Sequence, residues 1–146
     1  MFNILKHAHS GWRWVVLALL IYAIFNAFTK WRSGQSFEDK DRKTNLFAMV
    51  SVHIQLLLGF VLYFMSPSVQ FSSATMKDSM LRFFTVEHLV MMLIAVILIT
   101  IGNSMSKKAL EDTIKFKKTF TYYLIGLIII LAGIPWPFRG FGNGWF

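Results

Sequence analysis

The stretch Phe83–Asn103, "FFTVEHLVMMLIAVILITIGN", decides what kind of protein this chain forms. Glu87 and His88 are its only ionisable residues, and most of the others are apolar. A helix of ~20 such residues is long enough to cross the hydrocarbon core of a bilayer. The stretch therefore predicts a transmembrane helix that carries two titratable groups near one end.

Three further apolar runs predict three more spans, so that the four cover residues 11–31, 46–66, 83–103 and 120–138. The connections between these runs are short, which favours helices that alternate in direction. We expect an all-α, integral membrane four-helix bundle of up-down-up-down topology, with residues 1–146 forming a single membrane domain. Pro135 and Pro137 predict the end of the fourth span, because proline lacks a backbone donor.

The composition excludes several classes of protein. Charged residues make up 15% of the chain, against about 25% in soluble domains, which is typical of a membrane protein. The absence of cysteine excludes disulfides, thiolate metal sites, iron–sulfur clusters and covalently attached haem. No nucleotide-binding loop, nucleophile elbow or zinc motif is present, so an independent catalytic activity is not expected.

Basic residues are unequally divided between the two sides of the predicted bundle. Their excess gives a net charge of +8, but they lie in short blocks between apolar runs, which indicates contact with the lipid bilayer and no binding of nucleic acid. Ten of the 15 Lys and Arg residues flank the connections after the first and third spans. The positive-inside rule then predicts both termini outside, in a bacterial inner (cytoplasmic) membrane.

Three histidines are candidates for a functional site, because an ionisable group within a membrane is costly and needs a partner. His53 is the deepest by sequence, His88 begins just inside the third span, and His9 lies at the edge of the first. The alternative for each is a histidine that is simply hydrogen-bonded between helices. Neutral imidazole is also the side chain that ligates haem iron, so haem b is a candidate cofactor and the three histidines are candidate iron ligands.

Arg13 strengthens the haem hypothesis, since it lies one helical turn from His9 and can pair with a propionate carboxylate. Spans one and three are diagonal in such a bundle, which suits a His9–His88 pair. His53–His88 is the competing pair, and residue counting leaves either pair mismatched in depth by about 10 Å. Arg13 needs an anion, and Glu87 is the alternative to a propionate. Glu87 itself has two candidate ion-pair partners, Arg13 and Arg82.

The second span has two distinct faces. Ser51, Gln55 and Gly59 form a small and polar stripe, whereas His53 points away from it. Both faces cannot point equally into one small bundle. We therefore expect one of them to meet a cofactor, another membrane subunit or a second copy of the chain.

Five short motifs, "HSGWRW", "HIQLLLG", "EH", "IGNSMSKK" and "IPWPF", together resemble a group of small bacterial membrane proteins commonly labelled cytochrome B. The resemblance covers most of the chain and implies a four-helix inner-membrane protein with His9, His53 and His88 at motif positions. The chain lacks the paired deep histidines of a two-haem cytochrome b. Two functions are therefore predicted: a b-type cytochrome-like redox protein, or a non-catalytic structural or assembly subunit of a larger inner-membrane complex.

Overall fold

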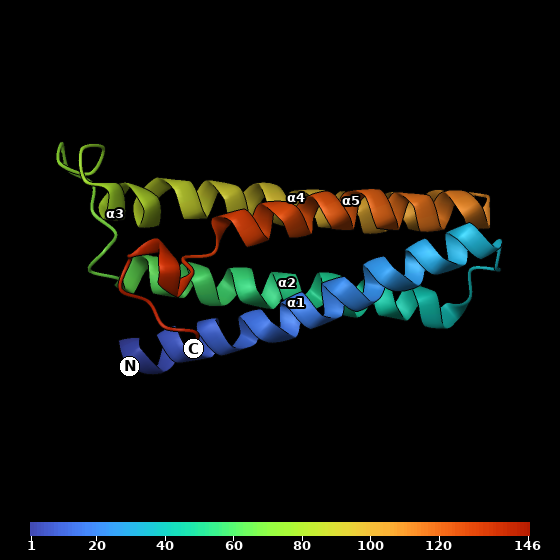
Figure 1. The fold of residues 1–146 in the computed structure, drawn as a ribbon, viewed down its shortest axis with the longest axis horizontal. Helices are drawn as coiled ribbons and strands as arrows, with labels where there is room; N and C mark the ends of the chain where they lie inside the picture. The colour runs from blue at the N-terminus through green and yellow to red at the C-terminus, as the bar shows by residue number, and fades with distance from the viewer.

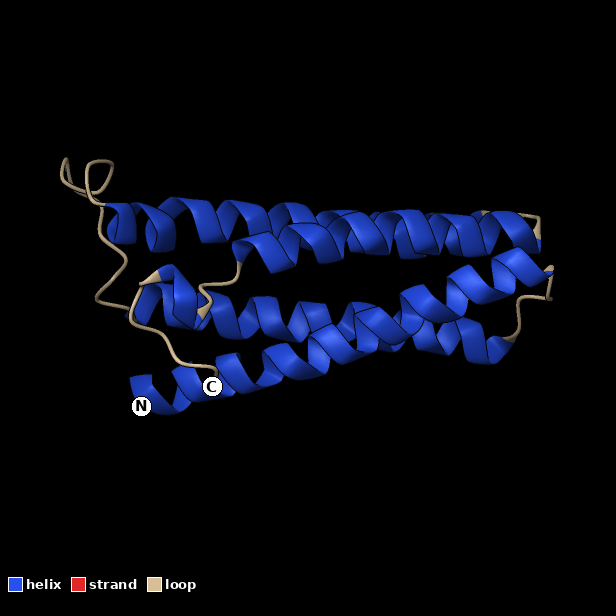
Figure 2. Cartoon of the chain, in the orientation of Figure 1, coloured by secondary structure: helices blue, strands red, loops and turns tan.

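The computed structural model describes residues 1–146 and contains four long helices and no strand (Figure 2). The four helices are α1 (Phe2–Ser33), α2 (Asp39–Met65), α4 (His88–Lys108) and α5 (Asp112–Gly133). A short α3 (Ser79–Arg82) and a π-helical turn, η1 (Phe83–Glu87), lead without a break into α4, and the 3-10 turn η2 (Pro137–Arg139) follows α5. The all-α prediction is confirmed, and so is the prediction of four helices long and apolar enough to span a membrane.

The helices form a bundle of two layers, α1 beside α2 and α4 beside α5 (Figure 1). Helix α1 packs against α2 and α5, and α4 packs against α5 and α2. The diagonal pairs are therefore α1 with α4 and α2 with α5. Both chain termini lie at the same end of the bundle. We call this end, which holds His9 and His88, the histidine end, and the opposite end, which holds Asp41, the aspartate end.

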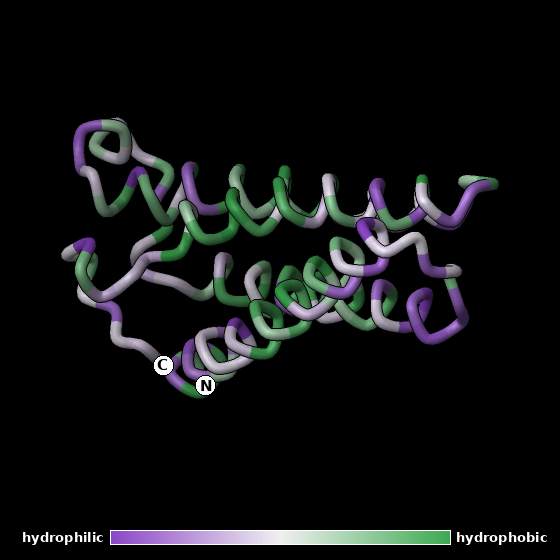
Figure 3. The backbone as a smooth tube through the Cα atoms, turned by 45° about the vertical axis from the view of Figure 1, so that its right-hand side comes forward, coloured by the Kyte–Doolittle hydropathy of each residue, from purple (hydrophilic) through white to green (hydrophobic).

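All four long helical segments are long and apolar enough to cross a membrane. Hydrophobic residues follow the middle of the helices, and hydrophilic residues gather at the connections of the aspartate end (Figure 3). Large apolar side chains on all four helices, such as Phe25, Leu57, Ile97 and Ile128, point away from the bundle. An apolar exterior of this extent suits lipid as the surrounding solvent, so the chain is a membrane protein.

The helices do not begin and end where the apolar runs do. Helix α1 starts at Phe2, nine residues before the predicted span, and α5 runs from Asp112 to Gly133 instead of over residues 120–138. Helix ends follow capping and proline positions more than hydropathy. Helix α1 ends at Gly34, whose φ of 66° lies in the left-handed region that favours glycine. Helix α5 ends at Gly133. The next residue, Ile134, precedes Pro135, and the residue before a proline disfavours helical backbone.

Small residues bring α4 and α5 into close contact. Ala95, Ile99 and Gly102 are buried on α4, and their spacing places them on one face of the helix. On α5, a Cβ added to Gly126 would lie 2.7 Å from Ile99 Cγ1, so only glycine permits this approach. Tyr123 is fully buried beside this contact. The close packing thus fixes α4 against α5. It thereby fixes the position of His88, the first residue of α4.

Candidate cofactor site at the histidine end

The structure brings His9 and His88 together across the bundle diagonal. Their ring centroids lie 6.4 Å apart, and the ring planes are inclined at 76°. Helix α1 is already helical at His9, and it crosses the bundle at an incline to α4 (Figure 1). The depth mismatch predicted by counting residues disappears because the edges of the two apolar runs do not lie at the same level. His9–His88 is therefore the histidine pair that shares a site.

His53 lies elsewhere, between α2 and α4. Its Nε2 is 2.8 Å from Thr100 Oγ1, and that hydroxyl donates its own hydrogen to the Val96 carbonyl at 2.7 Å. A hydroxyl has one hydrogen, so His53 Nε2–H must be the donor in the contact with Thr100. This is the interhelical hydrogen bond named above as the alternative to ligation. His53 is not among the residues that line the histidine-end cavity.

The ring of His88 is oriented by a backbone carbonyl. Its Nδ1 lies 2.7 Å from the Gly133 carbonyl oxygen, at the last residue of α5. A carbonyl only accepts, so Nδ1 carries the hydrogen and Nε2 keeps its electron pair. This is the arrangement that fixes the tautomer of metal-ligating histidines, in which the second ring nitrogen donates to a carbonyl or carboxylate. His88 is thus prepared to ligate through Nε2.

His9 is held against α2 by the polar stripe of that helix. Gln55 Nε2 donates to the His9 backbone carbonyl at 2.9 Å. A Cβ added to Gly59 would lie 3.2 Å from His9 Cε1, so the absence of a side chain at Gly59 gives the imidazole its place. Gln55 and Gly59 therefore turn toward the site, whereas His53 faces the α2–α4 boundary.

Arg13 is only 8% exposed and has no carboxylate partner. Its Nη2 donates to the Trp145 carbonyl at 2.6 Å, and its guanidinium lies 5.5 Å and 5.6 Å from the ring centres of Trp14 and Trp136. Its Nε is buried without a hydrogen-bond partner. The guanidinium therefore keeps unused donor capacity inside the protein, which carries a free-energy cost unless an acceptor is supplied.

The predicted Arg13–Glu87 ion pair does not form. Glu87 Oε1 instead accepts from Arg82 Nε at 2.7 Å, five residues earlier on the same helical segment. The π-helical turn between these two residues brings positions i and i+5 close together. Glu87 therefore pairs with Arg82 on its own helical segment, and Arg13 has no carboxylate of the chain to pair with.

A cavity of about 350 Å³ connects these groups. The whole chain has three buried side-chain nitrogen or oxygen atoms without a hydrogen-bond partner, and they are His9 Nδ1, Arg13 Nε and Gln55 Oε1. All three residues line this cavity, together with His88 and Tyr63. Buried polar groups are nearly always satisfied, so a cluster of exceptions around one cavity indicates a binding site for a ligand with polar groups.

The C-terminal residues Phe141–Phe146 close one wall of the cavity. Phe141 stacks on Phe83 with ring centres 4.6 Å apart, and the Trp145 carbonyl accepts from both Arg13 and Trp14. Figure 1 shows this segment returning from the end of α5 to the first turns of α1. The sequence predicted only that the fourth span ends at Pro135 and Pro137. No sequence motif indicates that the backbone of the C-terminal residues would contact Arg13.

The side chains around the cavity limit which metal or cofactor could bind there. No group of three or more His, Cys, Asp or Glu side chains is placed to hold a metal ion, whereas two imidazoles lie edge to face, with ring centres 6.4 Å apart, at the wall of a mainly apolar cavity. A pair of imidazoles would suit a metal whose remaining ligands come from a macrocycle. Comparisons with protein-family models, with curated proteins and with solved structures found no match. The assignment of the site therefore depends on its geometry.

Proposed function

We propose that this chain is a membrane-embedded haem b protein that carries one electron at a time, in which His9 and His88 would hold the haem iron. The observation that carries the proposal is the separation of 6.4 Å between the two ring centres. Metal–imidazole nitrogen bonds are about 2 Å long, so this separation allows one metal ion to be bound by a nitrogen from each ring. A bound haem would supply reversible one-electron iron chemistry.

The residues around the pair fit the same cofactor. The hydrogen bond from His88 Nδ1 to the Gly133 carbonyl orients the ring and raises the basicity of Nε2. Arg13, with an unpartnered Nε and no carboxylate, can pair with a propionate. The cavity walls are mainly apolar, which excludes water from the ligands and favours the macrocycle.

The test is the absorption spectrum of the protein purified in mild detergent from cells supplied with a haem precursor. We expect a Soret band that shifts on reduction, and one haem per chain by pyridine haemochrome. His9→Ala and His88→Ala should each lose most of the bound haem, whereas His53→Ala, the matched control, should keep it. A folded but colourless wild-type protein would refute the proposal and leave the non-catalytic subunit as the better account.

The membrane and the orientation belong to the same proposal. The excess of basic residues around the connections of the aspartate end supports a bacterial cytoplasmic membrane with the histidine end outside. Single cysteines at Ser36 and Lys108 should then react with a membrane-impermeant thiol reagent only after the membrane is opened. Labelling of both positions in intact cells would reverse the orientation without affecting the haem assignment.

A further inference from the structure

The turn that precedes His88 is not α-helical. Residues Phe83–Glu87 form a π turn, in which the His88 N–H donates to the Phe83 carbonyl five residues earlier. Such turns are rare, and they are frequently found at functional sites. Its position is specific, because the π turn ends directly before His88, the first residue of α4.

The π turn changes which side chains share a face. On an α-helix, positions five residues apart point about 140° away from each other. Here two such pairs are in contact: the rings of Phe83 and His88 lie 5.7 Å apart, and Arg82 is bonded to Glu87. Phe83 is consequently 1% exposed, although His88 also turns toward the cavity. Without the wider turn, burying Phe83 would direct His88 away from its site.

One side chain from α2 reaches this turn. Tyr63 donates its hydroxyl hydrogen to the Thr85 carbonyl at 2.8 Å, in the middle of the π turn. Thr85 is buried, and its Oγ1 accepts from the Gln70 backbone N–H at 3.1 Å. Tyr63 thus supplies a partner to a carbonyl in a segment whose backbone hydrogen bonding departs from the α-helical pattern.

We infer that Tyr63 is a positioning residue for His88: its hydrogen bond to Thr85 holds the π turn that aims the imidazole at the cofactor cavity. This inference rests on the proposed haem function. It assigns to Tyr63 no direct role as a ligand. The effect passes through the backbone of residues 83–88 to the ring of His88.

The test compares Tyr63→Phe with Tyr123→Phe. Each substitution removes one phenol-to-carbonyl hydrogen bond, since Tyr123 donates to the Asn45 carbonyl at 2.7 Å, away from the cavity. In protein prepared without haem, Tyr63→Phe should raise amide exchange of residues 83–90 about fivefold, whereas Tyr123→Phe should leave that segment unchanged. In protein loaded with haem, Tyr63→Phe should weaken haem retention roughly tenfold and change the spin state of the oxidised iron.

The outcomes separate the inference from the function on which it rests. A wild-type protein without haem refutes the haem proposal, and the role of Tyr63 toward a cofactor is refuted with it. Wild-type protein that binds haem, together with Tyr63→Phe that matches it in exchange and spectrum, overturns the inference alone. Equal effects of Tyr63→Phe and Tyr123→Phe on haem would also overturn it, because both would then act through general stability.

Discussion

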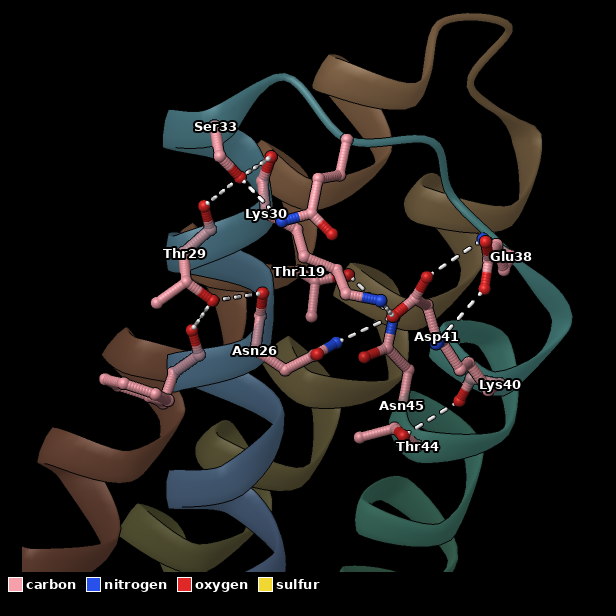
Figure 4. Close-up of polar contacts among 12 residues, drawn as sticks. Asn26, Thr29, Lys30, Ser33, Glu38, Lys40, Asp41, Thr44, Asn45 and Thr119 are labelled. Atoms are coloured by element: carbon pink, nitrogen blue, oxygen red, sulfur yellow. Dashed lines mark hydrogen bonds and ion pairs between the residues drawn. The ribbon is translucent and has the colours of Figure 1, made fainter.

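The two ends of the bundle treat buried polar groups in opposite ways. At the aspartate end, Asp41 is 1% exposed and accepts from Lys30, Asn26 and the Glu38 N–H at 2.7–2.9 Å (Figure 4). At the histidine end, Arg13 is also buried, at 8% exposed, but its Nε has no acceptor. A polar network with all its hydrogen bonds made holds the helices in place. A buried polar group without a partner in a cavity can still form a hydrogen bond to a ligand.

The aspartate-end network continues into the core of the bundle. Asn45 Nδ2 donates to Thr119 Oγ1 at 2.9 Å, and Thr119 lies 3.1 Å from Ser106 Oγ. Tyr123 closes the network by donating to the Asn45 carbonyl. These contacts connect α2, α4 and α5, and Lys30–Asp41 adds α1. We conclude that this end fixes the relative positions of all four helices, which leaves the histidine end free to accommodate a ligand.

The largest loss of stability should come from breaking the hydrogen-bond network at the aspartate end. Asp41→Ala removes the acceptor of Lys30 and Asn26, and we expect the free energy of unfolding to fall by about 3 kcal/mol, because the loss of one partner strands a buried charge. Lys30 can relieve part of the cost by turning its ammonium toward water. Unfolding in mixed detergent micelles measures the change.

The matched control is Asp39→Asn, on the same turn of α2. Asp39 pairs with Arg42 and Lys43 on the surface, where ion pairs are screened by water and salt. Its unfolding midpoint should stay at the wild-type value. If Asp41→Ala were as mild as this control, the aspartate end would not be the fixed end of the bundle.

A smaller loss of stability is expected when the buried charge of Arg13 is removed at the histidine end. Arg13→Met keeps the length of the side chain but removes a buried guanidinium with an unused donor, so the unfolding free energy of haem-free protein should change by less than about 1 kcal/mol. Haem retention should fall at the same time, because a propionate loses its cation. A loss of stability as large as that of Asp41→Ala would place Arg13 in the structural network.

The smallest change in stability should follow from one added methyl group. Gly59→Ala places a Cβ 3.2 Å from His9 Cε1, so the imidazole must shift by a few tenths of an ångström. We expect unfolding to be nearly unchanged and haem affinity to fall, measured by transfer of haem to an acceptor protein. Gly11→Ala is the control, since its Cβ meets nothing within 4 Å. Equal haem affinity in the two variants would argue against His9 as a ligand.

The sequence predicted the spans better than it predicted their contacts. Apolar runs identify the four helices, and Pro135 and Pro137 indicate where the last of them ends. The histidine pair remained open, because residue counting assumes that the edges of apolar runs lie at equal depth. The inclined path of α1 breaks that assumption and brings His9 level with His88.

The partner of Arg13 could not be predicted, for a different physical reason. Charge complementarity favours a carboxylate such as Glu87, but the π turn places Glu87 beside Arg82. The group that Arg13 contacts instead is the backbone carbonyl of Trp145. Every residue has a backbone carbonyl, so the amino-acid sequence does not indicate which one Arg13 will contact. The Gly133 carbonyl at His88 was missed for the same reason.

The location of the cavity at one end of the bundle has an electrical consequence. A unit charge that crosses an entire membrane under 100 mV changes in energy by about 2.3 kcal/mol. A charge that enters the cavity from the histidine end travels only the first part of that path, because His9 and Arg13 lie in the first turns of α1 and His88 begins α4. If haem is bound as proposed, its reduction from the same side should depend only weakly on the transmembrane voltage, whereas an electron delivered through the aspartate end would have to cross most of the field.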